Sequence, residues 1–260
     1  ISDSDDLIKV LEDHPVINMV GFMKRYLNSY LKVKEILSNN ILGKIFTCHA
    51  TAYVSQLFTK GKGWRYRKEQ SGGGTFITIA IHALDLIYWY FGLPNRVGAN
   101  TLFEFSKEVE DFGHATMVYE NGMICTLDTS WSVHNHRLLD TTLVINGENG
   151  RLIVNEDVIK LFLKEKRPDH NAGWTTLYNT DLYEGGQIDI GGYHFTKQDE
   201  TFIKAVQSGI LQKGGGHKMA AGFTLKKEKI PIFRDYLIKN YEKSTINLYK
   251  NTNLYLDSII

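Results

Sequence analysis

The sequence is poor in the residues that build several common kinds of site. Its two cysteines, Cys48 and Cys125, are too few and too scattered for a disulfide framework or a zinc site. No G-x-G-x-x-G motif and no Walker lysine loop occurs in the 260 residues, so neither kind of nucleotide-binding loop is expected. A formal charge of +1 gives no general attraction to nucleic acid or to a membrane surface.

Long apolar segments are also scarce. No apolar run reaches the roughly 18 residues that a membrane span needs. No basic-then-apolar leader precedes a cleavage site. We therefore expect a cytoplasmic protein with no membrane partner, whose 260 residues bury one large core or two smaller ones.

The first 22 residues predict the end of an α/β unit. Residues 2–6 supply N-cap residues and early acids for a short helix, and His14-Pro15 stops it. The apolar run VINMVGF at 16–22 follows as a buried strand of the parallel-sheet kind. Because one helix and one buried strand end such a unit, we expect residues 1–22 to be the remnant of a truncated Rossmann domain.

Residues 23–209 predict an α+β domain. Apolar residues at helical spacing over 23–39 are followed by a strand-like stretch at 45–58. The period then changes to two, with turn residues such as Asn121-Gly122 between the strands. We expect an open, mostly antiparallel sheet backed by helices, and a homo-oligomer surface on its open face. The expected elements are strands at 97–105, 115–119, 123–133, 141–145, 151–154 and 158–163, a polar loop at 165–192 and a helix at 193–208.

The chain is organised around residues 71–94, SGGGTFITIAIHALDLIYWYFGLP. Glycines open this segment and Gly-Leu-Pro closes it, which predicts a helix that is apolar almost all round and therefore buried. The exceptions, spaced four, three and four apart on one stripe, are Thr78, His82, Asp85 and Trp89. An imidazole with a carboxylate three residues on suggests an acid–base pair. The alternative is a core histidine whose neighbouring carboxylate is solvated or hydrogen-bonded.

The preceding loop, residues 59–74, is rich in glycine, lysine and arginine and contains Trp64 and Arg65. Such a loop, facing a helix with a polar stripe, suits an anionic or polyhydroxylated ligand. A solvated basic loop with one anchoring tryptophan is the alternative interpretation.

Several motifs occur in a fixed order: GFMKRY (21–26), GWR (63–65) before SGGG (71–74), the helix with His82 and Asp85, EVEDFGHATMVYENG (108–122), INGENGRLIV (145–154) and GYHFTKQDETFIKAVQSG (192–209). Together they resemble the C-terminal substrate domain of Gfo/Idh/MocA-type NAD(P)-dependent sugar and polyol dehydrogenases. The resemblance covers roughly residues 1–209.

The resemblance implies that His82 accepts the proton of a substrate hydroxyl while hydride passes to NAD or NADP. It also implies a sugar or polyol pocket lined by a set of polar and aromatic side chains: Arg25, Trp64, Arg65, Thr78, Asp85 and Tyr193. Many members have an aspartate where this chain has Thr78. The cofactor domain and its Glu-Lys-Pro lysine would precede Ile1, so we expect this chain to be inactive alone.

Residues 210–260 form a basic tail of foreign appearance. The core GGGHKMAAGF (214–223) resembles the glycine-glycine-histidine region of RecJ-type DHH exonucleases, which implies phosphate contacts at Gly215, Gly216 and His217. The alternative function is thus a binding module for phosphate or single-stranded nucleic acid, although the tail's basic residues lack interleaved aromatic platforms. We expect two unrelated sequences joined near 209–214, for instance by an assembly or gene-boundary error, with a genuine fusion as the alternative. We also expect the tail to pack poorly on the rest.

Overall fold

The computed structural model describes residues 21–182, together with Asp6, Val10, residues 213–217 and 220–224, and Ile232. The chain divides into two compact units, Leu27–Tyr183 and a second unit made of Ile1–Tyr26 with Glu184–Ile260. The expected helix at 193–208 and most of the expected strand at 16–22 lie outside the described residues. The expected domain boundaries near 22 and 209 therefore stay predictions.

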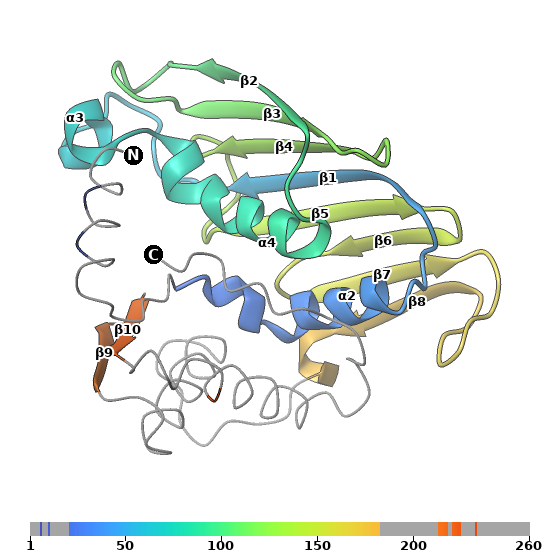
Figure 1. The fold of residues 1–260 in the computed structure, drawn as a ribbon. Coiled ribbons are helices and arrows are strands. Elements are labelled where there is room, and N and C mark those ends of the chain that lie inside the picture. Colours follow the sequence, from blue (N-terminus) through green and yellow to red (C-terminus); the bar gives the residue numbers. More distant parts are fainter. Residues whose placement is uncertain are drawn as a thin grey trace. The chain divides into compact units, whose positions relative to one another are not determined.

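An eight-stranded sheet forms the body of Leu27–Tyr183, in the order β2-β3-β4-β1-β5-β6-β7-β8 (Figure 1). β1 runs parallel to β4, and every other neighbouring pair is antiparallel. The expected open, mostly antiparallel sheet is therefore confirmed. Its strands are β1 (Ile45–Tyr53), β2 (Arg96–Leu102), β3 (Phe112–Val118), β4 (Ile124–Ser130), β5 (Asp140–Gly147), β6 (Gly150–Val154), β7 (Val158–Leu163) and β8 (Gly173–Tyr178).

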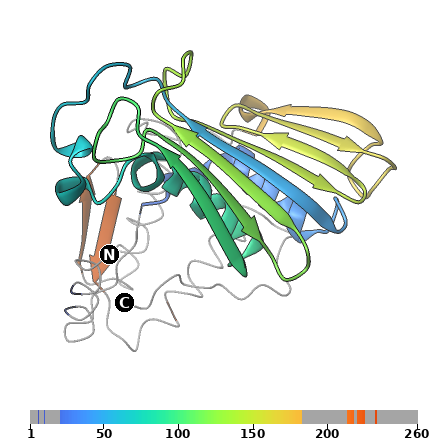
Figure 2. The same ribbon diagram turned by 90° about the horizontal axis from the view of Figure 1, so that it is seen from above.

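Two helices cover one face of this sheet, as Figures 1 and 2 show. α4 (Ile81–Phe91) lies against β1, and α2 (Asn28–Ser38) lies against β6 and β7. We call the other side of the sheet the open face. The remaining helical segments are short: η1 (Met23–Tyr26), η2 (Trp64–Tyr66), α3 (Lys68–Ser71), η3 (Phe76–Ala80, a π-helix) and η4 (Asn179–Leu182).

The core lies between the sheet and the helices. Along β1, Cys48, Ala50 and Ala52 are buried while the side chains between them are more exposed, which is the alternation of a strand with one covered face. Facing residues of other strands complete the core, among them Leu127, Leu143, Ile145, Leu152 and Ile159. Cys48 pairs in register with Cys125, and both are free thiols.

The structure differs from the sequence expectation at β8, which occupies part of the predicted polar loop 165–192. β8 is an edge strand that pairs only with β7, so its outward residues Trp174 and Tyr178 are 59% and 56% exposed. A strand that buries little surface shows little alternation of apolar and polar residues. The polar residues on either side of β8 made the segment look like a loop. The helix expected at 23–39 is also interrupted at Leu27, between η1 and α2.

By length and composition alone, one helical stretch passes the test for a membrane span. Lys68–Phe91 covers 24 residues and contains an 18-residue window with a mean hydropathy of 1.3. In the fold, Ala83, Leu86 and Ile87 of α4 are buried in the core, so we interpret this stretch as a core helix.

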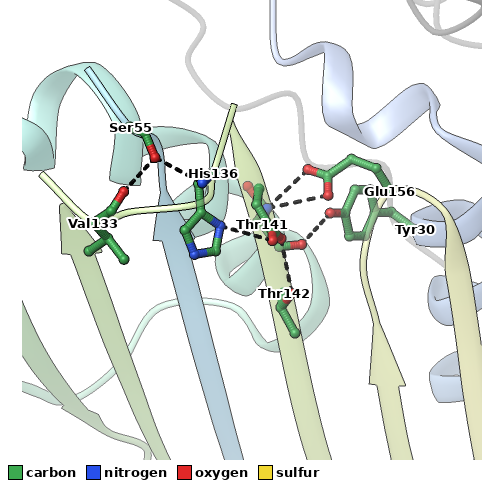
Figure 3. Close-up of polar contacts among 8 residues, drawn as sticks. Tyr30, Ser55, Val133, His136, Thr141, Thr142 and Glu156 are labelled. Atoms are coloured by element: carbon green, nitrogen blue, oxygen red, sulfur yellow. Dashed lines mark hydrogen bonds and ion pairs between the residues drawn. The ribbon is translucent and has the colours of Figure 1, made fainter. Parts of the chain in front are cut away.

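A polar network ties α2 to the sheet (Figure 3). The hydroxyl of the fully buried Tyr30 donates to the carbonyl of Thr141 at 2.6 Å. The backbone N–H of Thr141 in turn donates to the carboxylate of Glu156 at 3.1 Å. Burial, and then the nearby Glu156, raise the pKa of Tyr30 well above its usual value, so the phenol remains a donor. The network fixes α2 over β5 and the turn between β6 and β7.

Candidate functional site

α4 carries the candidate acid–base pair. His82 is half-buried and Asp85 is 6% exposed, one turn apart on the same helix. The helix packs on β1, so its position is fixed by the core rather than by a loop. A half-buried imidazole beside a buried carboxylate on a rigid helix has the geometry expected for a positioned proton acceptor. The role of His82 remains a prediction.

Thr78, predicted to bind substrate, lies one turn before His82 in the π-helical segment η3. Its hydroxyl donates to the carbonyl of Gly74 at 2.8 Å. The hydroxyl proton is therefore used within the helix, which leaves the oxygen lone pairs for a ligand. Trp89, at the other end of the stripe, packs elsewhere: its ring lies 5.5 Å from the ammonium of Lys34 on α2. The predicted stripe thus reduces to Thr78, His82 and Asp85.

The glycine run before the helix has a structural explanation. The N–H groups of Gly74 and Phe76 donate to the carboxylate of Glu110 at 2.9 and 3.0 Å, and the N–H of Thr75 donates to its carbonyl. A Cβ at Gly74 would lie 2.0 Å from that carbonyl oxygen, so only glycine fits there. Glu110 therefore caps the helical segment that carries His82. Nothing in the sequence pattern indicated this contact, because the partners lie more than 30 residues apart.

Replacing Glu110 by alanine should destabilise the fold by about 1–2 kcal/mol, the usual cost of losing a helix cap. The two N–H groups that it binds would be left without their acceptor. Urea denaturation of the chain measures the change. Glu108→Ala is the matched control, because the exposed Glu108 accepts one surface hydrogen bond, from Lys68. Equal losses in the two variants would contradict the capping role.

The other predicted substrate-binding residues that the structure describes lie outside η3 and α4. Trp64 and Arg65 lie in η2, both exposed, with the Arg65 guanidinium 5.7 Å from the Trp64 ring centre. Arg25 belongs to η1 in the second unit, 5.9 Å from the ring of Phe22. Tyr193 lies outside the described residues. Their grouping around His82 therefore stays a prediction.

The predicted phosphate-binding residues of the tail lie in a two-stranded hairpin of the second unit. β9 (Lys213–His217) pairs antiparallel with β10 (Ala220–Thr224). Gly215 and Gly216 pair with Gly222 and Ala221, and His217 ends β9. The description of this hairpin extends to its backbone pairing, so phosphate contact by these residues remains a prediction.

Ser55, His136 and Asp140 are the residue types of a nucleophilic triad, but they do not have its geometry. Figure 3 shows the contacts of Ser55 and His136. His136 bonds to Asp140 through Nδ1 at 3.2 Å. Ser55, however, donates its hydroxyl proton to the carbonyl of Val133 and accepts from the backbone N–H of His136. Because no imidazole nitrogen receives the serine proton, this group cannot activate a nucleophile.

The open face carries a second histidine–carboxylate cluster that sequence reasoning missed. His114 Nδ1 lies 2.7 Å from Asp128, and His49 Nε2 lies 3.8 Å from the other oxygen of the same carboxylate. These residues come from β3, β4 and β1, and only the strand order brings them together. Within the described part of the chain, no group of three histidine, cysteine or acidic residues is arranged to hold a metal ion.

Comparison with known proteins finds similarity to one family over part of the chain. Residues 30–153 match the model of the GFO/IDH/MocA C-terminal domain. Oxidoreductase P35 of Formosa agariphila is 27% identical over 154 residues, covering 58% of this chain and 47% of the relative. The 2,7-anhydro-N-acetylneuraminate hydratase of Escherichia coli is 24% identical over 164 residues, covering 59% and 41%. The chain spans less than half the length of either relative.

The solved structures agree in fold. Levoglucosan dehydrogenase, in a complex with NADH and levoglucosan, superposes with a TM-score of 0.62 at 20% identity, covering 88% of this chain and 65% of that one. At this identity the likeness shows the fold alone. Over residues 30–153, and in the sheet and helices of Leu27–Tyr183, the chain is therefore similar to the C-terminal domain of GFO/IDH/MocA proteins.

Proposed function

We propose that this chain is the substrate domain of an NAD(P)-dependent sugar or polyol dehydrogenase of the GFO/IDH/MocA family. The observation that carries the proposal is the His82–Asp85 pair on α4, inside the segment that matches the family model. The levoglucosan dehydrogenase of similar fold is described with NADH and a sugar. One relative is called an oxidoreductase and another a 2,7-anhydro-N-acetylneuraminate hydratase, so the chemistry at the pair must be tested directly.

In this proposal His82 acts as the general base. A neutral imidazole accepts the proton of a carbinol hydroxyl at a pH close to its own ordinary pKa. Asp85, one turn away and buried, steadies the imidazole or binds a second hydroxyl. Trp64 and Arg65 offer a flat ring and a fork of donors to the rest of the sugar. The nicotinamide, when bound, supplies the hydride acceptor.

The described residues do not fit NAD(P). A pyrophosphate needs free N–H groups at a glycine-rich helix start. At the glycine-rich start described here, the N–H groups of Gly74 and Phe76 are already held by Glu110. We therefore propose that the dinucleotide binds outside residues 21–182, and derive no hydride step within them. The proposal predicts that the chain alone has no turnover.

The proposal includes self-association through the open face of the sheet. The part of this face over β6–β8 combines the Phe162 and Trp174 rings, packed 5.4 Å apart, with the exposed side chains of Arg151 and Lys160. Trp174 and Tyr178 are more than half exposed. Exposed rings of this kind favour contact with a second copy over contact with water. Sedimentation velocity tests this part, and a chain that stays monomeric would contradict it.

Dehydrogenase assays test the proposed function. NADH formation is measured with levoglucosan and a panel of aldoses and polyols, first for this chain and then for a longer protein that joins it to a dinucleotide-binding domain. We expect no turnover in the first case and turnover with at least one sugar in the second. Robust NADH formation by the chain alone would overturn the assignment of the cofactor site.

The resemblance of the tail to RecJ-type proteins remains a separate proposal. Filter binding of single-stranded DNA at two salt concentrations tests it on the same preparation, because phosphate contacts weaken as salt rises. Salt-sensitive binding that is lost on His217→Ala would favour the alternative function. Absence of binding would leave the substrate domain as the one proposed function.

A further inference from the structure

The loop that leads into the His82 helix carries a dense group of positive charges. Residues 60–68, which we call the basic loop, contain no acid and five cations: Lys60, Lys62, Arg65, Arg67 and Lys68. All five side chains are exposed, and none forms an ion pair with a carboxylate of the described residues. Their charge is therefore available to an anion from outside the fold.

The basic loop is anchored by a tyrosine. The Tyr66 ring packs edge-on against the buried Trp131 at 5.3 Å, and a Cβ at Gly61 would lie 2.6 Å from the same ring. Two turn hydrogen bonds close η2 around Tyr66. The N–H of Lys68 donates to the carboxylate of Glu108 at 3.1 Å. Because these contacts already hold the backbone of the loop, little ordering remains to be done on binding.

This anchor lies on the covered side of the sheet. Trp131 continues the buried row that includes Leu127 and Thr129 of β4. Tyr66 packs against the same core. Figure 1 shows α3, which begins at the last residue of the loop, and the start of η3–α4 at the end of the sheet where β1 ends. The basic loop thus lies at the N-terminal end of the helical segment that carries His82, away from the open face.

Trp64 gives the loop an exposed aromatic ring. Sequence alone left open a solvated basic loop with an anchoring tryptophan, but the anchoring residue is Tyr66, and Trp64 is 58% exposed. The Arg65 guanidinium lies 5.7 Å from the centre of the Trp64 ring. An exposed indole can pack on the C–H face of a sugar, and a guanidinium beside it can bind a carboxylate or phosphate through two parallel hydrogen bonds. The pair therefore fits a sugar that carries a negative charge.

Acidic residues limit the size of the anion. Glu69 follows the loop directly and Glu108 is held at its Lys68 end, and both carboxylates are exposed. Further phosphates of a polymer would lie against these carboxylates, whereas a single anionic group would not. Within residues 60–68 the exposed ring is that of Trp64, and binding of single strands needs several such rings. The charge pattern therefore favours a small anion over nucleic acid.

We infer that the basic loop binds the anionic group of a sugar acid or a sugar phosphate. Arg65 donates to the carboxylate or phosphate oxygens, the neighbouring lysines add positive charge, and the sugar ring packs on Trp64. The inference rests on the proposed function and narrows it, because the substrate of the dehydrogenase is then an anionic sugar. Its charged group is held by the loop that precedes the His82 helix, and no covalent step takes place at the loop.

Calorimetry and saturation-transfer NMR on this chain test the inference. The probes are D-glucose, D-glucuronate and D-glucose-6-phosphate, with acetate and inorganic phosphate as anions without a sugar. At least one anionic sugar should bind about tenfold more tightly than D-glucose, and the difference should shrink as salt is added. Comparison of the two anionic sugars distinguishes recognition of a carboxylate from recognition of a phosphate. Anionic sugars that bind no more tightly than D-glucose, or that do not bind, would overturn the inference. Acetate or inorganic phosphate that binds as tightly as the corresponding sugar would overturn the assignment to a sugar.

Three variants locate the anion. Arg65→Gln should remove most of the preference for the anionic sugar, and Trp64→Ala should weaken binding of that sugar several-fold. Arg151→Gln is the matched control, because it removes the same charge from an exposed arginine on β6 and should retain binding. Circular dichroism establishes that each variant is folded, which is expected because all three side chains are exposed. An equal loss in Arg151→Gln would assign the effect to net charge and overturn the role of the loop.

Kinetics of the longer protein that adds a dinucleotide-binding domain separate this inference from the proposed function. We expect kcat/KM to be about tenfold higher for an anionic sugar than for its neutral counterpart. Turnover of neutral sugars with an equal kcat/KM would overturn the inference and leave the proposed function intact. Arg65-dependent binding of an anionic sugar by this chain, without turnover of any sugar by the longer protein, would overturn the proposed function and leave the anion site.

Discussion

Replacing His82 by alanine, in a longer protein that joins this domain to a dinucleotide-binding domain, should lower kcat roughly 10²–10⁴-fold, the usual contribution of a positioned general base. The dependence of kcat/KM on pH should also lose an ionisation near neutrality, since imidazole is the group that titrates there. Steady-state kinetics with the best sugar substrate, measured between pH 5 and pH 9, provides both results.

The competing interpretation of His82 as a core residue makes a different forecast. In that case His82→Ala would lower stability with little loss of turnover in the folded fraction. His49→Ala is the control, because His49 lies on the open face, and it should leave kcat and the pH profile unchanged. A folded His82→Ala protein with near wild-type kcat would end the catalytic assignment.

The sheet was largely predictable because its covered strands alternate. The sequence of β1 already shows the period of two through Cys48, Ala50 and Ala52, and Asn121-Gly122 marks the hairpin between β3 and β4. β8 was not predictable to the same degree, because Trp174 and Tyr178 face outward at an edge. Periodicity therefore detected strands in proportion to the apolar surface that they bury.

The candidate site was predictable within one helix and not across elements. The spacing of His82 and Asp85 on one side of α4 follows from helical geometry alone. The cap that Glu110 provides to the same helical segment depends on a loop more than 30 residues away, and no periodicity records it. The cluster of His114 with Asp128 likewise depends on strand order. Local patterns specified the elements, and tertiary pairing specified their polar contacts.

Replacing Asp111, which follows the capping residue Glu110 in the chain, should have the largest effect on stability. Its Oδ2 accepts the backbone N–H groups of Glu104, Phe105 and Ser106 at 2.7–2.8 Å, and Oδ1 accepts the indole N–H of Trp131 at 2.7 Å. The residue is fully buried. Asp111→Asn keeps the shape but turns one acceptor into a donor that faces these donors. We expect a loss of about 2–4 kcal/mol in the free energy of unfolding at neutral pH.

The same contacts predict how stability depends on pH. Burial alone would raise the pKa of Asp111, but the hydrogen bonds from Ser106, Trp131 and Phe105 outweigh it and lower the pKa below the ordinary value. A carboxyl whose pKa is lower in the folded state stabilises the fold above its unfolded pKa of about 3.9, and this contribution disappears as the pH falls through the folded value. Wild-type stability should therefore decrease below about pH 4, and this part of the decrease should be absent in Asp111→Asn.

Urea denaturation of the wild type and the variant at pH 7 and at pH 3 tests both expectations. The difference in stability between the two proteins should be large at pH 7 and smaller at pH 3, because protonation removes the charge that the variant already lacks. Asp157→Asn is the matched control, since Asp157 is exposed in the turn between β6 and β7 and should change stability by less than about 0.5 kcal/mol. A constant difference across this pH range would show that Asp111 contributes through the hydrogen-bond acceptor that asparagine lacks and not through its charge. If instead Asp111→Asn were as stable as Asp157→Asn, the loop that positions Glu110 against the His82 helix would not depend on this carboxylate.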